Sequence, residues 1–250
     1  MHAVHRLYQY RKSLSTTEYK SRGRKVIRCE LCHLAKQHCI CSLKPKITSD
    51  IGFLLLMYDT EVLKPSNTGK LIADLFDNTF AFLWSRTSVD QQVLDMINDG
   101  QWQPYVVFPA EYAMPQQQIF EQQLKLPIGV KPLFIILDGS WREAKKMFRK
   151  SPYLHHLPML SIDPQQCIAG DYFSKYHIRQ AAKSNQLATA EVAAHAVALA
   201  GELEHANILE CWFDLYSYRY QKSVCQTNKG DPQALTRLTE LLKNTYKVTK

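Results

Sequence analysis

The sequence predicts an α/β protein whose mostly parallel sheet carries helices on both faces. Two observations support this fold class. Short apolar segments alternate with amphipathic segments along residues 47–162, which is the pattern of repeated strand–helix units. The apolar segments have no polar side, as expected for strands that are buried on both faces. A cysteine-rich segment before this region and a helical region after it predict two smaller appendages.

The expected elements follow one another in a regular order. Strands are expected at residues 51–57, 80–84, 105–108 and 133–137, with a last strand at 157–162 that Pro158 interrupts. Helices are expected at residues 70–77, 89–97, 116–124 and 140–150, and then at 186–200, 208–221 and 233–245. Ser140 and Glu143 have the capping-box spacing at the start of the fourth helix. We therefore divide the chain into a basic arm with a four-cysteine module (1–46), a sheet domain (47–225) and a helical tail (226–250).

The positive charge of the chain is concentrated near its N-terminus. The net charge is +8, and residues 1–46 hold eleven Lys and Arg against two acids, which is +9, so the remainder is close to −1. Such a basic arm favours contact with a polyanion such as RNA. Tyr8, Tyr10 and Tyr19 lie among these basic residues, where they would either stack on unpaired bases or pin the arm to the body.

The sequence favours a cytoplasmic protein with no membrane contact. No apolar run approaches the roughly 20 residues needed to cross a bilayer, and the first residues lack the apolar core of a signal peptide. In that compartment cysteines are thiols or metal ligands. The sequence does not decide between a monomer and a homodimer.

Four of the seven cysteines form one cluster. Cys29, Cys32, Cys39 and Cys41 have the spacing C-x2-C-x6-C-x-C. Four thiolates satisfy tetrahedral zinc, and the short C-x2-C loop lets two sulfurs reach one ion. Because all four positions are filled, we expect a structural zinc ion. The alternative is a redox-sensitive thiol cluster.

Polar clusters follow the ends of four expected strands, at residues 58–70, 85–87, 109–112 and 138–141. The carboxyl ends of parallel strands share one edge, where ligands bind, so these clusters predict a common site. The bland alternative is that strand ends simply need polar loops. Neither a phosphate-binding loop nor a G-x-G-x-x-G motif is present, so Asn67, Thr68 and Gly69 are interpreted as a helix start suited to a carboxylate or a hydroxyl.

Several of these segments together resemble one known family. Asp138-Gly139-Ser140-Trp141 resembles the D-x-T/S-W signature of the DTW-domain family, and residues 66–71 resemble its N-T-G block. Residues 83–87, 108–113, 174–179 and 187–191 are similar to its other conserved segments. The four cysteines lie where bacterial members carry theirs. The resemblance covers about residues 25–222 and departs at Tyr58, where the family pattern suggests histidine.

The resemblance implies an enzyme that acts on tRNA. Members are similar in fold to the knotted SPOUT-like methyltransferases, so a knot is expected here. They transfer the 3-amino-3-carboxypropyl group of S-adenosylmethionine to N3 of a tRNA uridine, at position 47 in bacteria, and release 5′-methylthioadenosine. Two alternatives remain open: S-adenosylmethionine-dependent RNA methylation by a related fold, and a zinc-containing RNA-binding protein without catalysis.

The resemblance and the strand-end positions together nominate the site residues. Asp138 is the candidate base for the uracil N3 proton, or else it grips the cofactor or orients the uracil. Trp141 either stacks on a base or packs in the core. The expected cofactor-binding residues are Asn67, Thr68, Gly69, Pro109, Glu111, Ser140, Trp141, Leu187, Thr189 and Glu191. The expected RNA-binding residues are Arg86, Arg142, Lys145, Lys146, Arg149 and Arg179. Arg142, Lys145, Lys146 and Arg149 share one face of the helix after Ser140. The alternative for these four residues is a solvated helix face that contacts no RNA.

Overall fold

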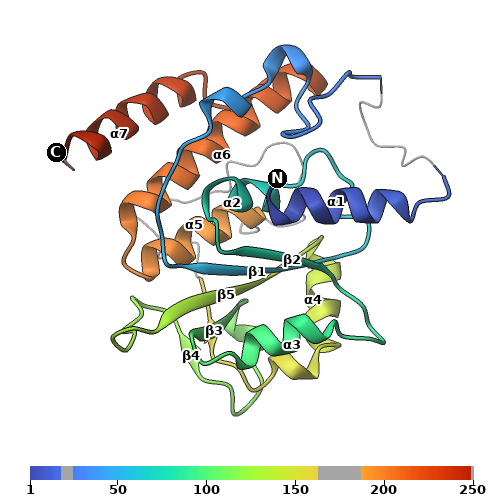
Figure 1. Ribbon diagram of the computed structural model, residues 1–250, viewed down its shortest axis with the longest axis vertical. Helices are drawn as coiled ribbons and strands as arrows, with labels where there is room; N and C mark the ends of the chain where they lie inside the picture. Colours follow the sequence, from blue (N-terminus) through green and yellow to red (C-terminus); the bar gives the residue numbers. More distant parts are fainter. Residues whose placement is uncertain (18–24, 163–186, 249–250) are drawn as a thin grey trace.

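Six parallel strands form one sheet within the part of the chain that the computed structural model describes, residues 1–17, 25–162 and 187–248. The strand order is β2-β1-β5-β3-β6-β4 (Figure 1). The strands are β1 (Gly52–Met57), β2 (Thr79–Leu83), β3 (Trp102–Val107), β4 (Ile119–Phe120), β5 (Lys131–Asp138) and β6 (Met159–Leu160). The predicted α/β class with a parallel sheet is confirmed.

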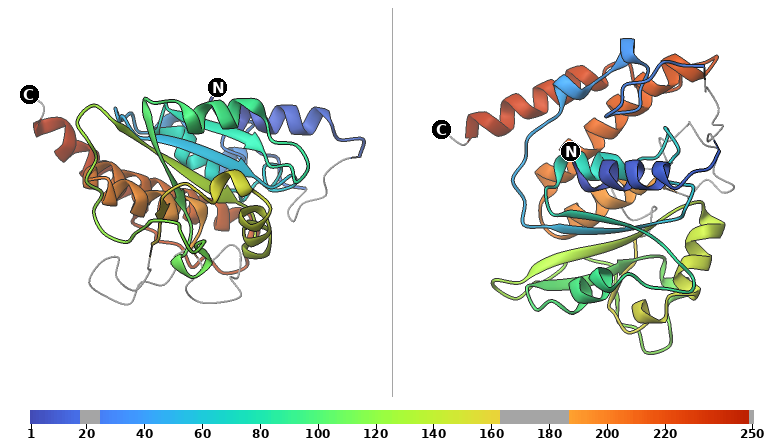
Figure 2. Two further views of the ribbon diagram at one scale, coloured as in Figure 1. Left: turned by 90° about the horizontal axis from the view of Figure 1, so that it is seen from below. Right: turned by 45° about the vertical axis from the view of Figure 1, so that its right-hand side comes forward.

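Helices cover both faces of this sheet (Figure 2). The helices are α1 (Ala3–Ser13), α2 (Gly69–Leu75), α3 (Gln91–Asn98), α4 (Trp141–Arg149), α5 (Thr189–Leu199), α6 (Leu203–Val224) and α7 (Ala234–Val248). Helices α1, α2, α5 and α6 lie on one face together with the cysteine segment, and α7 packs on α6. Helices α3 and α4 cover the other face. The expected C-terminal helices are confirmed.

The neighbouring strands β1 and β5 show why apolar runs identify this sheet. Side chains alternate between its faces, so Phe53, Leu55 and Met57 of β1 enter the core under α2, α5 and α6, while Leu54 and Leu56 enter the core over α3 and α4. All of these residues are buried. Strand β5 pairs with β1 in parallel register from Gly52 opposite Leu133 to Met57 opposite Asp138. The register brings the end of β1 beside Asp138.

One expected helix, residues 116–124, is wrong. The segment contains the short strand β4, which extends the sheet beside β6. The Met159 and Ser161 amides donate to the Gln118 and Phe120 carbonyls, and the buried Gln117 amide donates to the Leu154 and Leu157 carbonyls. These pairings with distant residues satisfy the backbone in an extended form, and tertiary contacts of this kind override helix propensity. The last expected strand is shorter than predicted, since β6 begins after Pro158.

Near the N-terminus, helix α1 (Ala3–Ser13) docks on the body of the protein. Ala3, Val4 and His5 of α1 are buried, and the Arg11 guanidinium pairs with Asp59 at 2.6 Å. The expected knot is not shown by the described residues and stays a prediction. Among these residues, none of the helices combines the length and the apolar composition that crossing a membrane requires.

Candidate functional site

Asp138 is a buried carboxylate on which three segments converge. It ends β5 and is only 2% exposed. Its Oδ2 accepts a hydrogen bond of 2.7 Å from Nδ2 of Asn67, and its Oδ1 accepts one of 2.7 Å from Oγ1 of Thr189. Asn67 precedes α2 and Thr189 begins α5. Residues far apart in the chain therefore meet at the predicted edge of the sheet.

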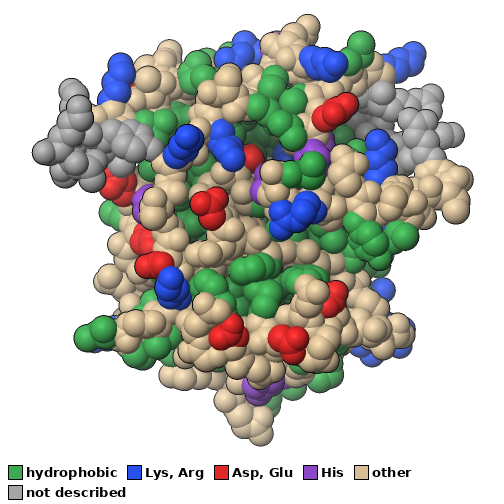
Figure 3. Space-filling view, in the orientation of Figure 1, with side chains coloured by type: hydrophobic (Ala, Val, Ile, Leu, Met, Phe, Trp, Pro, Cys, Tyr) green, Lys and Arg blue, Asp and Glu red, His purple; other side chains and the backbone are tan. Residues whose placement is uncertain are grey.

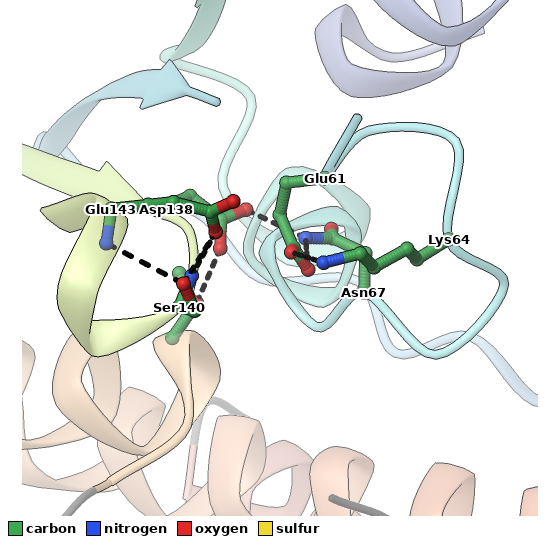
Figure 4. Close-up of polar contacts among 7 residues, drawn as sticks. Glu61, Lys64, Asn67, Asp138, Ser140 and Glu143 are labelled. Atoms are coloured by element: carbon green, nitrogen blue, oxygen red, sulfur yellow. Dashed lines mark hydrogen bonds and ion pairs between the residues drawn. The ribbon is translucent and has the colours of Figure 1, made fainter. Parts of the chain in front are cut away.

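The loop between β1 and α2 positions Asn67 through successive β-turns that repeat every three residues. The amides of Glu61, Lys64 and Asn67 donate to the carbonyls of Tyr58, Glu61 and Lys64, respectively. This spacing places the Glu61, Lys64 and Asn67 side chains together (Figure 4). Glu61 is 1% exposed, and its carboxylate contacts Lys64 Nζ at 2.6 Å and Asn67 Nδ2 at 3.3 Å.

Glu61 and Lys64 belong to the site, although they were not among the predicted site residues. The Asn67 amide bridges two buried carboxylates, and Lys64 supplies a positive charge beside one of them. The sequence signal for this group was available, because three polar residues recur at intervals of three within one strand-end loop. This spacing brings the three side chains together only if the loop forms successive turns, and the Pro-containing sequence does not predict such turns.

Gly69 allows α2 to approach the carboxylate closely. A Cβ atom built on Gly69 would lie 2.6 Å from Asp138 Oδ2, which is closer than real Cβ contacts. Thr68 ties this helix start to α5, because its Oγ1 accepts a hydrogen bond from the Ala190 amide at 3.3 Å. The predicted group Asn67, Thr68 and Gly69 therefore lies beside Asp138.

Other predicted residues serve the helix starts around this centre. Glu191 is buried, and its Oε2 accepts a hydrogen bond of 2.7 Å from the Ala188 amide, which fixes the beginning of α5. Leu187, just before this helix, is half-buried. Ser140 caps α4 in a capping box with Glu143, as predicted. The structure thus brings Asn67, Gly69 and Thr189 against Asp138 and uses Ser140 and Glu191 as helix caps.

The ends of β3 and β5 carry the remaining predicted cofactor residues. Trp141 packs against Phe108, with 6.0 Å between the ring centroids. Pro109 precedes a short 3-10 helix (Ala110–Tyr112) in which Glu111 is exposed. This contact supports the core-packing alternative for Trp141, although the residue is only partly buried.

Basic and aromatic side chains combine along the same edge. Tyr58 and Trp84 stack with centroids 6.0 Å apart, and Lys146 Nζ lies 5.6 Å and 6.0 Å from their ring centroids. Lys145 Nζ lies 5.8 Å from the Tyr112 ring. Arg86, Arg142 and Arg149 are exposed nearby on the β2 end and α4. Arg179 lies outside the described residues.

The four predicted cysteines form a compact group that could hold a metal ion. All four Sγ atoms lie within 4.8 Å of one another. The Cys29–Cys41, Cys32–Cys39 and Cys29–Cys39 Sγ separations are 3.7, 3.8 and 3.6 Å. Tetrahedral zinc with Zn–S bonds of about 2.3 Å separates its sulfurs by roughly 3.8 Å, so the donor set fits this ion.

The surroundings of the cysteines shift the pKa values of three of their thiols in different directions. Burial would raise the pKa of the Cys29 thiol, but hydrogen bonds from the Cys32 and Leu31 amides and from neighbouring thiols outweigh it and lower that pKa to about 7. Burial raises the pKa of the Cys32 thiol to about 11 and also raises the pKa of the Cys41 thiol. A bound divalent cation deprotonates such thiols, because it is the largest local charge.

Comparison with known proteins agrees with the motifs. No solved structure matches this chain at a significant level. Residues 26–221 match the model of the DTW domain, a span that includes the cysteine group, the whole sheet and Asp138. This match covers most of the chain, and the chain therefore belongs to the DTW domain family.

Proposed function

We propose that this protein transfers the 3-amino-3-carboxypropyl group of S-adenosylmethionine to N3 of a tRNA uridine, with position 47 as the expected target. The observation that carries the proposal is the Asp138 centre: the aspartate of the family signature meets Asn67 of the N-T-G block and Thr189 of another family block. A buried carboxylate held on both oxygens is a fixed group, as acid–base chemistry requires.

Asp138 has two ways to assist the reaction. Uracil N3 is a poor nucleophile while it carries its proton, and a carboxylate within hydrogen-bonding distance can accept that proton as the N3–C bond forms. The carbon–sulfur bond breaks as the N3–C bond forms, and its electron pair stays on sulfur. Alternatively, Asp138 orients the uracil edge. Asn67 and Thr189 fix both carboxylate oxygens, so in either role the geometry is set before the substrate arrives.

The residues around Asp138 fit the cosubstrate. S-adenosylmethionine supplies an electrophilic carbon beside a sulfonium, and a sulfonium is favoured next to buried carboxylates. Glu61 and Asp138 supply two buried carboxylates, and Gly69 lets the start of α2 pack closely against Asp138. The Oδ1 atom of Asn67 is buried without a hydrogen-bond partner in the described part of the chain, which is an acceptor suited to a ligand.

The basic and aromatic edge is suited to the RNA substrate. Cations hold phosphates, and aromatic rings stack on bases that leave the helix. Lys146 over Tyr58 and Trp84, and Lys145 over Tyr112, combine both properties beside the end of β5. The four cysteines would hold a structural zinc ion in the segment that precedes β1. Its role there is to hold the N-terminal segment in shape.

Product analysis tests the proposed reaction. The protein is incubated with unmodified tRNA and S-adenosylmethionine. The masses of the tRNA nucleosides are measured by mass spectrometry, and the by-product formed from S-adenosylmethionine is identified. A mass gain of one aminocarboxypropyl group with 5′-methylthioadenosine supports the proposal. A methyl gain with S-adenosylhomocysteine would establish methylation instead, and tRNA binding without any product would favour a non-catalytic RNA-binding protein.

A pair of matched variants connects the reaction to the centre. Asp138→Asn keeps the shape and removes the base, so we expect transfer to fall about 100-fold or more. Asp95→Asn makes the same change at an exposed helix position and should leave transfer intact. Equal activity of Asp138→Asn and the unaltered protein would contradict a chemical role for Asp138.

A further inference from the structure

The cysteine segment, residues 25–46, directs its apolar side chains both into the protein and out of it. Leu34 and Ile40 are fully buried in the core that the segment shares with α2, α5 and α6. Ile27 and Leu31 are instead 74% and 52% exposed, and neither belongs to that core. We refer to Ile27 and Leu31 as the apolar pair. Single exposed apolar residues are common, so the surroundings of the pair decide its meaning.

The backbone that carries the apolar pair is held in place. The Cys29 amide donates to the Leu34 carbonyl at 2.7 Å, and the His33 amide donates to the Cys29 carbonyl at 3.0 Å. His33 has a φ of 59°, a conformation that is uncommon for a residue with a Cβ atom. Its ring packs on Tyr8 of α1, with 4.5 Å between the ring centroids. Tyr8 thus joins α1 to the cysteine segment, and the segment presents Leu31 from a fixed turn.

The cysteine segment is also positively charged. Lys25, Lys36 and Lys44 are exposed on it, and Glu30 is its one acid. Residues 1–17 and 25–46 together hold eight Lys and Arg against this acid, a net charge of +7, which four thiolates around a zinc ion would lower by two. Figure 3 shows hydrophobic side chains among Lys and Arg side chains on the upper part of one face, where Figure 1 places this segment. Exposed apolar groups among cations suit a polyanion with flat apolar surfaces, which is a nucleic acid with unpaired bases.

The apolar pair lies close to the Asp138 centre. Leu31 and His33 line a narrow crevice together with Lys64 and Asn67 of the loop before α2. Asn67 is the residue that donates to Asp138 at 2.7 Å. The cysteine segment therefore borders the loop that shapes the centre, and a polymer that reaches Asp138 can extend over Leu31.

The chemistry of the target favours unpaired nucleotides at this position. The N3 atom of uridine carries the proton that Watson–Crick pairing uses, so transfer to N3 requires a uridine that is unpaired or extruded from a helix. The nucleotides on either side of such a uridine offer exposed base faces to the protein. Apolar side chains beside cations bind such nucleotides, and zinc knuckles recognise single-stranded RNA in this way.

We propose that the cysteine segment docks unpaired nucleotides next to the target uridine, with Ile27 and Leu31 against their bases and the neighbouring lysines at their phosphates. This inference rests on the proposed function. A second copy of the chain is a poorer occupant, because two surfaces of the same positive charge repel each other. The zinc ion keeps its structural role, since it would hold the backbone that presents the apolar pair.

The test compares two kinds of RNA with the full chain. Binding of a single-stranded oligoribonucleotide and of a blunt duplex of the same length is measured by fluorescence anisotropy. Ile27→Ser combined with Leu31→Ser removes the apolar pair and keeps every charge. We expect this variant to bind the single strand about 10-fold more weakly and the duplex as before. The slope of log affinity against log salt should be unchanged, because no cation is lost.

The control combines Ile128→Ser with Leu203→Ser, the same kind of change at two exposed apolar positions outside the cysteine segment, and should alter neither affinity. An unchanged metal content, measured by elemental analysis, shows that the segment of a variant is folded. Equal loss of both RNAs, or loss of neither, would overturn the assignment and leave the transfer reaction standing. A dimer that dissociates in the variant with unchanged RNA affinity would assign the apolar pair to contact between copies, which also overturns it. Failure of the unaltered protein to bind either RNA, with no transfer to tRNA, would overturn both proposals.

Discussion

Asn67 donates its Nδ2 to Oδ2 of Asp138 at 2.7 Å across 71 positions of sequence, and the same nitrogen lies 3.3 Å from Oε1 of Glu61. A neutral donor thus separates two buried carboxylates. Without it, two like charges would face each other in a medium that screens them poorly. The amide is therefore essential to the charge balance of the centre.

Asn67→Asp should abolish most of the transfer. The new carboxylate removes the donor and adds a third negative charge, so one of the three groups must take up a proton or the loop must move. We expect at least a roughly 100-fold lower transfer rate at neutral pH, measured as methylthioadenosine release. Asn207→Asp, an exposed change on α6, should have no effect. Full activity of Asn67→Asp would refute the bridging role.

The strands and the edge of the site were predictable for a definite reason. Residues 133–137 and 51–57 are continuous apolar runs, and such runs have few alternatives to a buried parallel strand. Once the strands are parallel, Asp138 and the 58–70 cluster must share an edge. The common edge follows from this geometry, whereas the contact between Asn67 and Asp138 also requires β1 and β5 to be neighbouring strands, which the sequence does not decide.

The features that were missed depend on contacts between distant residues. The segment 116–124 contains the short strand β4 because Gln118 and Phe120 pair with Met159 and Ser161, and no local pattern encodes these pairings. Glu61 and Lys64 face Asn67 only because three turns follow one another. The docking of α1 on the body depends on contacts such as that of Arg11 with Asp59, which lie 48 positions apart in sequence.

Gly69→Ala should disturb the centre although it adds a single methyl group. The new Cβ would lie 2.6 Å from Asp138 Oδ2, so either the start of α2 or the carboxylate must shift. We expect a loss of about 1–3 kcal/mol in the free energy of unfolding, together with reduced transfer. Gly100→Ala meets nothing within 4 Å and serves as the control in denaturant unfolding. Equal stability of the two variants would show that the close approach is unimportant.

Asp74 predicts a specific pH dependence of stability. Burial raises the pKa of Asp74 to about 6, although the Trp212 indole N–H, Lys44 and Lys70 lower it in part. His2 Nε2, at 3.6 Å, is the other facing group. Because the folded protein holds this proton more tightly than the unfolded chain does, the contribution of Asp74 to stability falls as pH rises from about 4 to 6.

Asp74→Asn should remove that dependence and keep an acceptor for Trp212. We expect the variant to match the unaltered protein near pH 4 and to be about 2 kcal/mol more stable near pH 7.5, as measured by denaturant unfolding. Because the pKa of His2 is lowered, His2 contributes a slope of stability against pH of the opposite sign, and this slope is present in both proteins. A stability difference independent of pH would contradict the raised pKa of Asp74.

The cysteine group should bind one zinc ion per chain. Cys39→Ser removes one of four closely spaced sulfurs, so we expect loss of bound zinc by elemental analysis and a lower midpoint of thermal unfolding. Cys225→Ser lies outside the group and should retain the metal. A protein that purifies without metal and keeps its stability under chelation would instead support a thiol cluster.

The exposed basic residues of α4 should control the affinity for tRNA. Lys145→Ala combined with Arg149→Ala removes two cations from the aromatic edge, and the removal of each cation that pairs with a phosphate should lower the slope of log affinity against log salt by roughly 1. We therefore expect weaker binding at low salt, a difference that shrinks as salt rises, and unchanged binding of methylthioadenosine. Lys243→Ala, an exposed cation on α7, is the matched control. If tRNA affinity is insensitive to salt, or if the α4 and α7 variants weaken it equally, then the α4 face is only a solvated surface and the RNA approaches the Asp138 centre from another side.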